Sequence, residues 1–421
     1  MPSEQQESAE PDLTGADAVG EAAAGGRLSR RRFVGAALGA AAAGGFLAAC
    51  SGDDDSAGGS DGTTGGDEGG GDEASTGDTD LDQALQASDL PTVEWDMPTS
   101  WPLVLDTIYG GAEFLAAQVS AMTGGRFRIT PSPGGEVVPA LEILQNIQTG
   151  AVIAGHTASY YYVGVDPITQ ISTAVPFGMN ARQHQSWMYE GGGLDQIQSI
   201  YRERFGLVNF PAGNTGCQMG GWFNKEINSV ADLGGLRMRI PGLGGEALAE
   251  LGVSVQVIPG GEIYQSLETG AIDAAEWVGP YDDLKQEFNK VTQFYYYPGW
   301  WEPGPSLDLM VEASQYDSLP EEYQAVLAAA SAFSYNQMLA RYDALNPPAL
   351  ADIEASGITL LPFPDDVMDA AAGEVDKLID AKAAADTDYA SLIDSYNSFR
   401  DTVGPWHGLA EKAMLDFLSR R

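Results

Sequence analysis

The fold of this chain is decided by one stretch, Gly270-Ala-Ile-Asp-Ala-Ala-Glu276-Trp277-Val-Gly279-Pro280. It is an apolar run of strand length that places a carboxylate and an indole side by side and then breaks at Gly-Pro. Glu276 and Trp277 are therefore predicted to lie where a strand ends and a loop begins. Ligands of α/β proteins bind at such strand ends.

The helix and glycine that precede this strand occur twice in the chain. Residues Glu142–Ala154 read EILQNIQTGAVIA and residues Glu262–Ala274 read EIYQSLETGAIDA, with seven of thirteen positions identical. Pro-Gly-Gly-Glu also occurs twice, at 133–136 and 259–262. Because glycine commonly caps helices, a chance likeness of two such junctions is the alternative. We interpret the repeat as two related lobes with a small-molecule cleft between them.

Alternating strand and helix patterns fill the rest of the folded region and predict the α/β class. We expect lobe I to comprise residues 91–213 plus about 306–345, and lobe II to comprise residues 214–305. The helix that begins at Glu321 is predicted to stop before Pro347-Pro348, because proline lacks the amide hydrogen that a helix needs. Residues 346–421 are then expected to form a C-terminal helical region.

The first 49 residues carry two export motifs. Ser29-Arg-Arg-Arg-Phe33 precedes an apolar run of about 16 residues that ends in Leu47-Ala-Ala-Cys50. The run is shorter than the roughly 20 residues of a membrane-spanning helix, and the motifs resemble a twin-arginine signal and a bacterial lipobox. We expect residues 1–49 to be a cleaved signal. Lipid on Cys50 would then anchor the exported protein to the outer face of the cytoplasmic membrane, in the periplasm or at the cell surface.

Residues 50–90 are predicted to be a disordered tether. From Ser51 to Leu90 the chain is rich in Gly, Ser, Thr and Asp, and it holds 12 acidic residues and no Lys or Arg. Such a segment buries too little apolar surface to offset the entropy of ordering. A flexible tether suits a receptor that collects a solute and hands it over.

Composition excludes several functions. The formal net charge of -39 argues against nucleic acid and anionic lipid as partners, so membrane contact is expected through the lipid anchor alone. If Cys50 carries lipid, Cys217 has no partner and no disulfide is expected. The three histidines lack metal-ligand spacing, and no Gly-x-Ser-x-Gly, Walker or Cys-x-x-Cys motif is present. We therefore do not expect an enzyme.

Four blocks of sequence resemble one family, the solute-binding proteins of tripartite ATP-independent periplasmic (TRAP) transporters, of the DctP type. The blocks are Gly220–Phe223, Arg237–Pro241, Gly270–Pro280 and Tyr295–Glu302. Within that family they are most similar to the subgroup that binds 2-oxoacids such as pyruvate, or lactate, together with a metal ion. The resemblance implies a two-lobed periplasmic-binding-protein-like fold with extra C-terminal helices.

The resemblance also implies how the acid is held. In that family an arginine binds the ligand carboxylate through two of its nitrogens, and Arg239 matches this arginine by its place in Met-Arg-Ile-Pro. A planar guanidinium suits bidentate capture of a carboxylate. Arg237, two residues earlier, is expected to be a surface charge. Tyr161 and Tyr162 match an aromatic pair near the family's pocket, and of the two we expect the Tyr162 hydroxyl to bind the acid.

A cation is implied by the same resemblance. The subgroup holds it with a glutamine amide, a glutamate, a backbone carbonyl and the ligand itself, and Gln218, Glu276 and the Trp277 carbonyl match these positions. Glu302 is expected close to the cation and the acid, and Gln218 and Trp277 are expected to touch the acid too. Oxygen ligands suit Na⁺ or Ca²⁺. A cation would also separate two glutamates from an anionic ligand.

The predicted function is uptake by secondary transport, with the receptor closing on a small monocarboxylate and presenting it to TRAP membrane subunits. A receptor for a sugar acid or a dicarboxylate is the alternative within the same family. An exported hydrolase that uses Glu276 and Glu302 as paired carboxylates is a more distant alternative. By resemblance, the C-terminal helices could join two copies in a homodimer.

Overall fold

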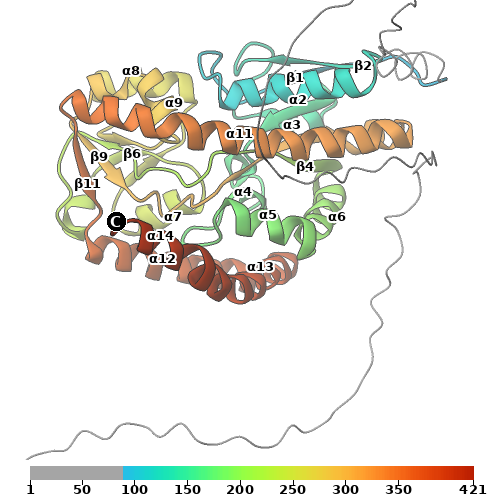
Figure 1. Ribbon diagram of the computed structural model, residues 1–421. Coiled ribbons are helices and arrows are strands. Elements are labelled where there is room, and N and C mark those ends of the chain that lie inside the picture. The colour runs from blue at the N-terminus through green and yellow to red at the C-terminus, as the bar shows by residue number, and fades with distance from the viewer. Residues whose placement is uncertain (1–88) are drawn as a thin grey trace, which may run out of the picture. The chain divides into compact units, whose positions relative to one another are not determined.

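The structure is a computed structural model that describes residues 89–421 (Figure 1). The predicted signal, Cys50 and the tether up to residue 88 lie outside the described residues. No helix within residues 89–421 is long and apolar enough to cross a membrane.

The first lobe is built on a three-stranded antiparallel sheet, of order β3-β10-β4, and a separate parallel pair, β1-β2. These strands are β1 (Val93–Pro98), β2 (Phe127–Ser132), β3 (Ala154–Thr157), β4 (Leu207–Asn214) and β10 (Ser306–Glu312). The helices of this lobe are α2 (Ile108–Met122), α3 (Ile143–Gln148), η1 (Ser159–Tyr162), α4 (Thr169–Thr173), α5 (Ala181–Glu190), α6 (Gly193–Phe205) and α10 (Ala313–Asp317). All of β4 is buried, because helices cover both of its faces.

The second lobe has a six-stranded mixed sheet of order β11-β9-β5-β8-β6-β7. Its strands are β5 (Trp222–Phe223), β6 (Arg237–Arg239), β7 (Ser254–Gln256), β8 (Ala274–Ala275), β9 (Phe294–Tyr297) and β11 (Thr359–Pro362). Its helices are η2 (Val230–Leu233), α7 (Gly242–Glu250), η3 (Gly260–Glu262), α8 (Ile263–Glu268), α9 (Pro280–Lys285) and η4 (Phe288–Lys290). The chain enters this sheet after β4 and leaves it between β9 and β10. The two sheets confirm the predicted two-lobed α/β fold.

The repeated sequence has the same local structure in both lobes. Helix α3 has Thr149 as its C-cap and helix α8 has Thr269, and each cap is followed by a glycine with positive φ, 72° at Gly150 and 69° at Gly270. Left-handed φ favours glycine, which explains why both copies keep it. Each unit then enters a buried strand, β3 or β8. The ends of these two strands carry the segments that meet between the lobes.

The long helix α11 (Glu321–Ala355) does not stop at its prolines, so the predicted end before Pro347-Pro348 is wrong. The helix continues through Pro347 and Pro348. Its last part carries Ala349 and Ile353 as buried residues, and Ile353 joins the apolar cluster that spans both lobes. Packing of this last part therefore outweighs the local cost of the two prolines. Figure 1 shows α11 running past both lobes.

Residues 346–421 are distributed over both lobes. Strand β11 joins the sheet of the second lobe beside β9. Helix α12 (Asp365–Ala385) packs on α7, whereas α13 (Thr387–His407) packs on α5 and α6 of the first lobe. The chain ends in η5 (Gly408–Lys412) and α14 (Ala413–Leu418), which have no buried residues.

A buried carboxylate, Asp308, lies in the central strand of the first lobe. Its side chain accepts a hydrogen bond from the Ser159 hydroxyl, at the start of η1, and a long one of 3.5 Å from the Ser172 hydroxyl. Burial raises the pKa of Asp308 to about 7. Its folded-state pKa therefore lies above its unfolded value, so its contribution to stability is present at low pH and is lost as the pH rises through about 7.

We predict that Asp308→Asn changes the pH dependence of stability. Without this ionisation, the variant gains free energy of unfolding relative to the wild type as the pH is raised from about 5 to about 8. Urea unfolding of both proteins at several pH values measures the difference. A difference that stays constant across that range would contradict the assignment.

Candidate functional site

The predicted site residues are brought together out of contact with solvent. The exposed fraction is 0% for Glu276, 1% for Arg239, 3% for Gln218 and Glu302, and 4% for Trp277. The structure is therefore a closed form, in which the lobes shield these side chains. A groove of about 320 Å³ lies between the lobes and is lined by residues of both Pro-Gly-Gly-Glu repeats, whereas none of the predicted site residues lines it.

Backbone pairing explains why these side chains converge. Strands β6 and β8 are parallel neighbours, and the Glu276 amide donates to the Arg239 carbonyl at 3.1 Å. Glu276 therefore leaves its strand next to the end of β6. The Gln218 amide donates to the Glu302 carbonyl at 3.1 Å, which joins the segment before β5 to the segment after β9. Residues far apart in the sequence thus meet at one edge of the second sheet.

Arg239 is held in place mostly by the second lobe. Its Nη1 donates to the Glu276 carbonyl at 3.0 Å and to the Glu276 carboxylate, and its Nε donates to the Ile258 carbonyl at 3.2 Å. The guanidinium also lies 5.2 Å from the centre of the Trp277 ring. Only Nη2 remains without a partner. The sequence predicts that two guanidinium nitrogens bind the ligand carboxylate. In this structure Glu276 already occupies one of them, Nη1.

Within residues 89–421, four buried polar atoms at this site have no hydrogen-bond partner. Three are oxygens, Gln218 Oε1, Glu276 Oε2 and Glu302 Oε2, and the fourth is the donor Arg239 Nη2. An unsatisfied buried polar atom is costly, so such atoms are rare in folded proteins. Three oxygens and one charged donor suit a cation and an anion bound together. No three His, Cys, Asp or Glu side chains within residues 89–421 are grouped as metal ligands, so the amide oxygen is needed too.

The pKa shifts of the two buried glutamates also favour a bound cation. Burial raises the pKa of Glu276 to about 7, with Arg239 opposing the shift and the nearby Asp283 adding to it. Burial and the nearby Glu276 raise the pKa of Glu302 well above its ordinary value. Ionising both carboxyl groups beside a single guanidinium would leave an excess of negative charge in a dry site, and a bound cation would neutralise that excess.

The tyrosines of η1 divide between the site and the core. Tyr161 lies beside the Arg239 guanidinium, and Tyr160 lies beside Glu302. Tyr162 is not brought to the other predicted residues, because its hydroxyl bonds Thr157 at 2.8 Å and its ring packs in the core of the first lobe. In a short 3-10 turn, three consecutive side chains point in different directions. The sequence alone, with three identical residues in a row, could not indicate which tyrosine faces the site and which faces the core.

Residues outside the predicted set are also informative. Arg237 forms an exposed ion pair with Asp273 at 2.6 Å, as a surface charge would. Cys217 is an exposed free thiol. Asp283 is 1% exposed and bonds the turn after Trp277, which the sequence pattern did not indicate.

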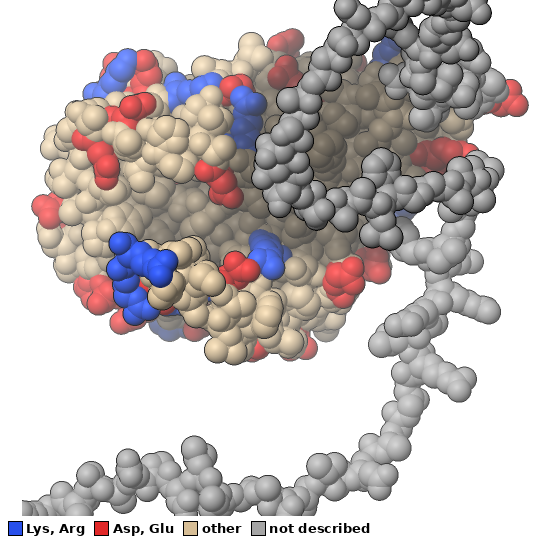
Figure 2. Space-filling model, viewed as in Figure 1, with Lys and Arg blue, Asp and Glu red and all other residues tan. Residues whose placement is uncertain are grey.

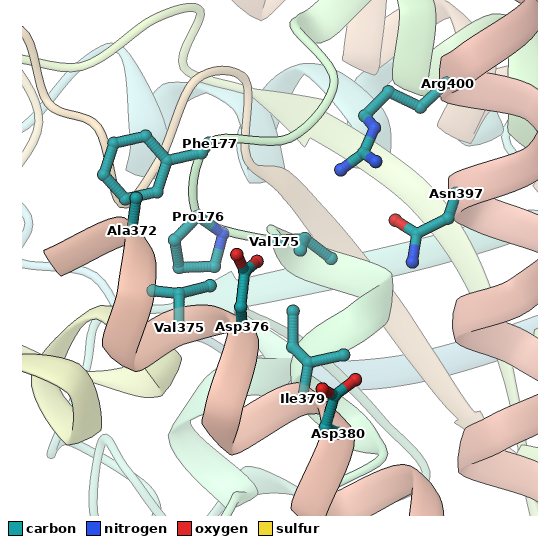
Figure 3. A pocket seen from close by; sticks show the side chains of 10 residues that line it. All are labelled: Val175, Pro176, Phe177, Ala372, Val375, Asp376, Ile379, Asp380, Asn397 and Arg400. Carbon is teal, nitrogen blue, oxygen red and sulfur yellow. The ribbon is translucent and has the colours of Figure 1, made fainter. Parts of the chain in front are cut away.

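Two other surface features lie away from this site. A cavity of about 290 Å³ is lined by residues from α12, α13 and the segment at Val175–Phe177 (Figure 3). Arg400 and Asp376 line it, and none of the predicted site residues does. On the face shown in Figure 2, acidic and basic side chains are scattered without a large basic patch.

Comparison with known proteins gives the family. The model of the DctP family, bacterial extracellular solute-binding protein family 7, matches residues 102–386. A monocarboxylate 2-oxoacid-binding periplasmic protein of Nostoc sp. is 51% identical over 330 residues, which cover 78% of this chain and 90% of that protein. The chain therefore belongs to the DctP family of bacterial extracellular solute-binding proteins, as the sequence resemblance indicated.

Two solved structures show the same fold with ligands. A TRAP transporter solute-binding protein from Bordetella bronchiseptica, described as a dimer with calcium and picolinate bound, is 44% identical with a TM-score of 0.77, and the match covers 78% of this chain and 98% of that one. A TRAP periplasmic solute-binding protein from Pseudoalteromonas atlantica, with bound sodium and pyruvate, is 38% identical with a TM-score of 0.75, and the match covers 77% of this chain and 99% of that one.

We predict that the charges of Arg239 and Glu276 depend on each other for stability. Arg239→Met leaves the buried Glu276 carboxylate unpaired, and breaking a buried pair in this way costs about 3–5 kcal/mol. The double variant Arg239→Met/Glu276→Gln should regain part of this loss. Urea unfolding of the wild type, both single variants and the double variant completes the cycle. Additive effects of the two substitutions would show that the pair contributes no coupling.

Proposed function

We propose that this protein is the solute receptor of a TRAP transporter, and that it binds a small monocarboxylate, a 2-oxoacid such as pyruvate, together with Na⁺ or Ca²⁺. The observation that carries this proposal is the set of four unpaired buried atoms at Gln218, Arg239, Glu276 and Glu302. The similar Nostoc protein is named for 2-oxoacids, and the two solved relatives hold an acid with calcium or sodium.

The cation is proposed to bind the oxygen side of the site. Gln218 Oε1, Glu276 Oε2 and Glu302 Oε2 are buried and unpaired, and the Trp277 carbonyl follows directly after Glu276 in the chain. Na⁺ and Ca²⁺ are hard cations that prefer oxygen ligands. The cation would hold the two glutamates ionised and would accept an oxygen of the acid.

The acid is proposed to bind Arg239 Nη2, with the Tyr161 hydroxyl beside it. Tyr161 thus takes the role predicted from sequence for Tyr162, and Trp277 and Tyr160 contribute the walls. Within the described residues, Arg239 is the only Lys or Arg that is buried. A dicarboxylate or a sugar acid with a second charged group would have no second buried base to meet it, so a monocarboxylate fits best.

We also propose that the protein acts as a receptor without catalysis. A paired-carboxylate hydrolase needs one free acid that donates a proton. Glu276 instead bonds the permanently charged Arg239. Both Glu276 and Glu302 are buried, at 0% and 3% exposed, so a polymer could not reach either carboxyl in this form.

The proposed location of the receptor rests on motifs in the N-terminal residues, which lie outside the described part of the chain. Ser29–Phe33 and Leu47–Cys50 support export by a twin-arginine signal and a lipid anchor on Cys50, with TRAP membrane subunits as partners. Replacement of Cys50 would then release the receptor from the membrane.

A homodimer through the C-terminal helices is part of the same proposal. The end of the chain exposes large apolar side chains, with exposed fractions of 61% at Trp406, 78% at Leu409, 58% at Met414 and 64% at Leu415. Contiguous exposed apolar surface of this kind marks an interaction site. The Bordetella bronchiseptica relative is described as a dimer, which favours a second copy as the occupant.

We predict that Leu409→Glu weakens the dimer, because a carboxylate placed in an apolar interface loses its hydration. Sedimentation velocity should show the wild type as a dimer and the variant shifted toward the monomer. Val137→Glu, at another exposed apolar position in the first lobe, serves as the control. A monomeric wild type would refute the dimer and leave the receptor function untouched.

The receptor function is tested by calorimetric titration with pyruvate in the presence of calcium, of sodium, or of chelator without sodium. We expect tight binding only when a cation is present. Arg239→Met should bind roughly tenfold to a hundredfold more weakly, because a charge-assisted hydrogen bond is lost. Arg237→Met is the matched control and should bind as the wild type does. Binding that ignores both the cation and Arg239 would contradict the proposal.

A further inference from the structure

A second buried carboxylate holds the turn that follows Trp277. Asp283 lies in α9 and is 1% exposed. Its Oδ1 accepts hydrogen bonds from the backbone amides of Val278, at 3.3 Å, and Gly279, at 3.2 Å. Its Oδ2 accepts from Trp222 Nε1, at 2.9 Å, and from the Tyr295 hydroxyl, at 2.7 Å. One carboxylate thus connects the turn to β5 and β9.

This arrangement fixes the direction of the Trp277 carbonyl. The Trp277 carbonyl and the Val278 amide belong to one planar trans peptide unit, so they point in opposite directions. When Val278 donates to Asp283, the Trp277 oxygen must face away from Asp283. Within residues 89–421, no backbone hydrogen bond outside the regular helices and strands ends on that oxygen.

We propose that Asp283 is a positioning residue for the cation, because it orients the peptide unit whose carbonyl is a cation ligand. This inference rests on the proposed function, in which the Trp277 carbonyl binds the cation. Asp283 does not touch the cation itself. Outer-shell partners of this kind typically change metal affinity 10-fold to 100-fold when they are replaced.

The chemistry of its four donors explains why the residue must be a carboxylate. Three of the donors are N–H groups, from Val278, Gly279 and Trp222, and these can only donate. Asparagine offers one oxygen and one NH₂ group. In Asp283→Asn, one of the two carboxylate oxygens is replaced by an NH₂ group, which cannot accept a hydrogen bond from an N–H group. Depending on the orientation of the amide, either the turn amides or the Trp222 indole therefore loses its acceptor.

The neighbouring Asp282 provides a matched control. It is equally buried, at 0% exposed, and it lies one residue away on the same helix. Its two donors are hydroxyl groups, from Tyr342 at 2.6 Å and from Thr107. Hydroxyl groups can donate or accept, so asparagine can keep both bonds. Asp282→Asn therefore removes a similar buried charge without disturbing the turn.

The test compares calcium affinity, measured calorimetrically in the presence of pyruvate, for the wild type, Asp283→Asn and Asp282→Asn. We expect Asp283→Asn to weaken calcium binding roughly 10-fold to 100-fold and Asp282→Asn to change it about twofold or less. At saturating calcium, Asp283→Asn should recover pyruvate affinity close to that of the wild type. Thermal unfolding without calcium reports separately on any loss of stability.

The outcomes separate this inference from the proposed function. Wild-type calcium affinity in a folded Asp283→Asn variant would overturn the positioning role. Equal losses in both variants would do so as well, because they would indicate a general effect of charge. If Asp283→Asn does not fold, Tyr295→Phe removes one donor, and unchanged calcium affinity there would count against the role. If sodium and not calcium supports pyruvate binding by the wild type, the same comparison is made with sodium. A wild type that binds pyruvate with neither calcium nor sodium would instead refute the receptor proposal.

Discussion

The ion pair between Arg239 and Glu276 is the interaction on which the rest of the site depends. Both side chains are buried, and together they leave one guanidinium nitrogen and one carboxylate oxygen without partners. When atoms of a buried ion pair lack hydrogen-bond partners, the attraction between the two charges offsets only part of the free energy lost with their hydration. Ligands of opposite charge that complete the site would therefore stabilise the closed form. An acid beside Arg239 and a cation beside Glu276 would meet that requirement together.

A helix–glycine–strand unit that occurs once in each lobe builds the two sides of this site. Each lobe contains a short helix, a left-handed glycine and a buried strand, and the strand ends of the two copies face the cleft. In the first lobe the strand leads into the tyrosines of η1, and in the second it leads into Glu276 and Trp277. Asp308 and Asp283 fasten the segments that follow these strands, through Ser159 and through the Val278 amide. Comparable buried carboxylates thus support the two walls of the cleft.

Sequence reasoning predicted the two-lobed α/β fold and a set of residues that the structure brings together, namely Gln218, Arg239, Glu276, Trp277 and Glu302. It succeeded where a local pattern decides the outcome, as in the glycine-capped repeat and the strand that ends at Glu276. It failed where packing between distant segments decides. Helix α11 continues past Pro347 because its end is buried, and Tyr162 points into the core because Thr157 binds its hydroxyl. Asp283 was missed because its donors come from three separate segments.

Acid and cation are proposed to bind this site as a mutually neutralising pair. This pairing is tested most directly by measuring pyruvate affinity across a range of calcium concentrations and calcium affinity across a range of pyruvate concentrations. Linkage requires that each ligand strengthen the other by the same factor. We predict a coupling of roughly tenfold or more in both directions. Pyruvate affinity that stays unchanged after calcium and sodium are depleted would show that the two ligands do not bind as a pair.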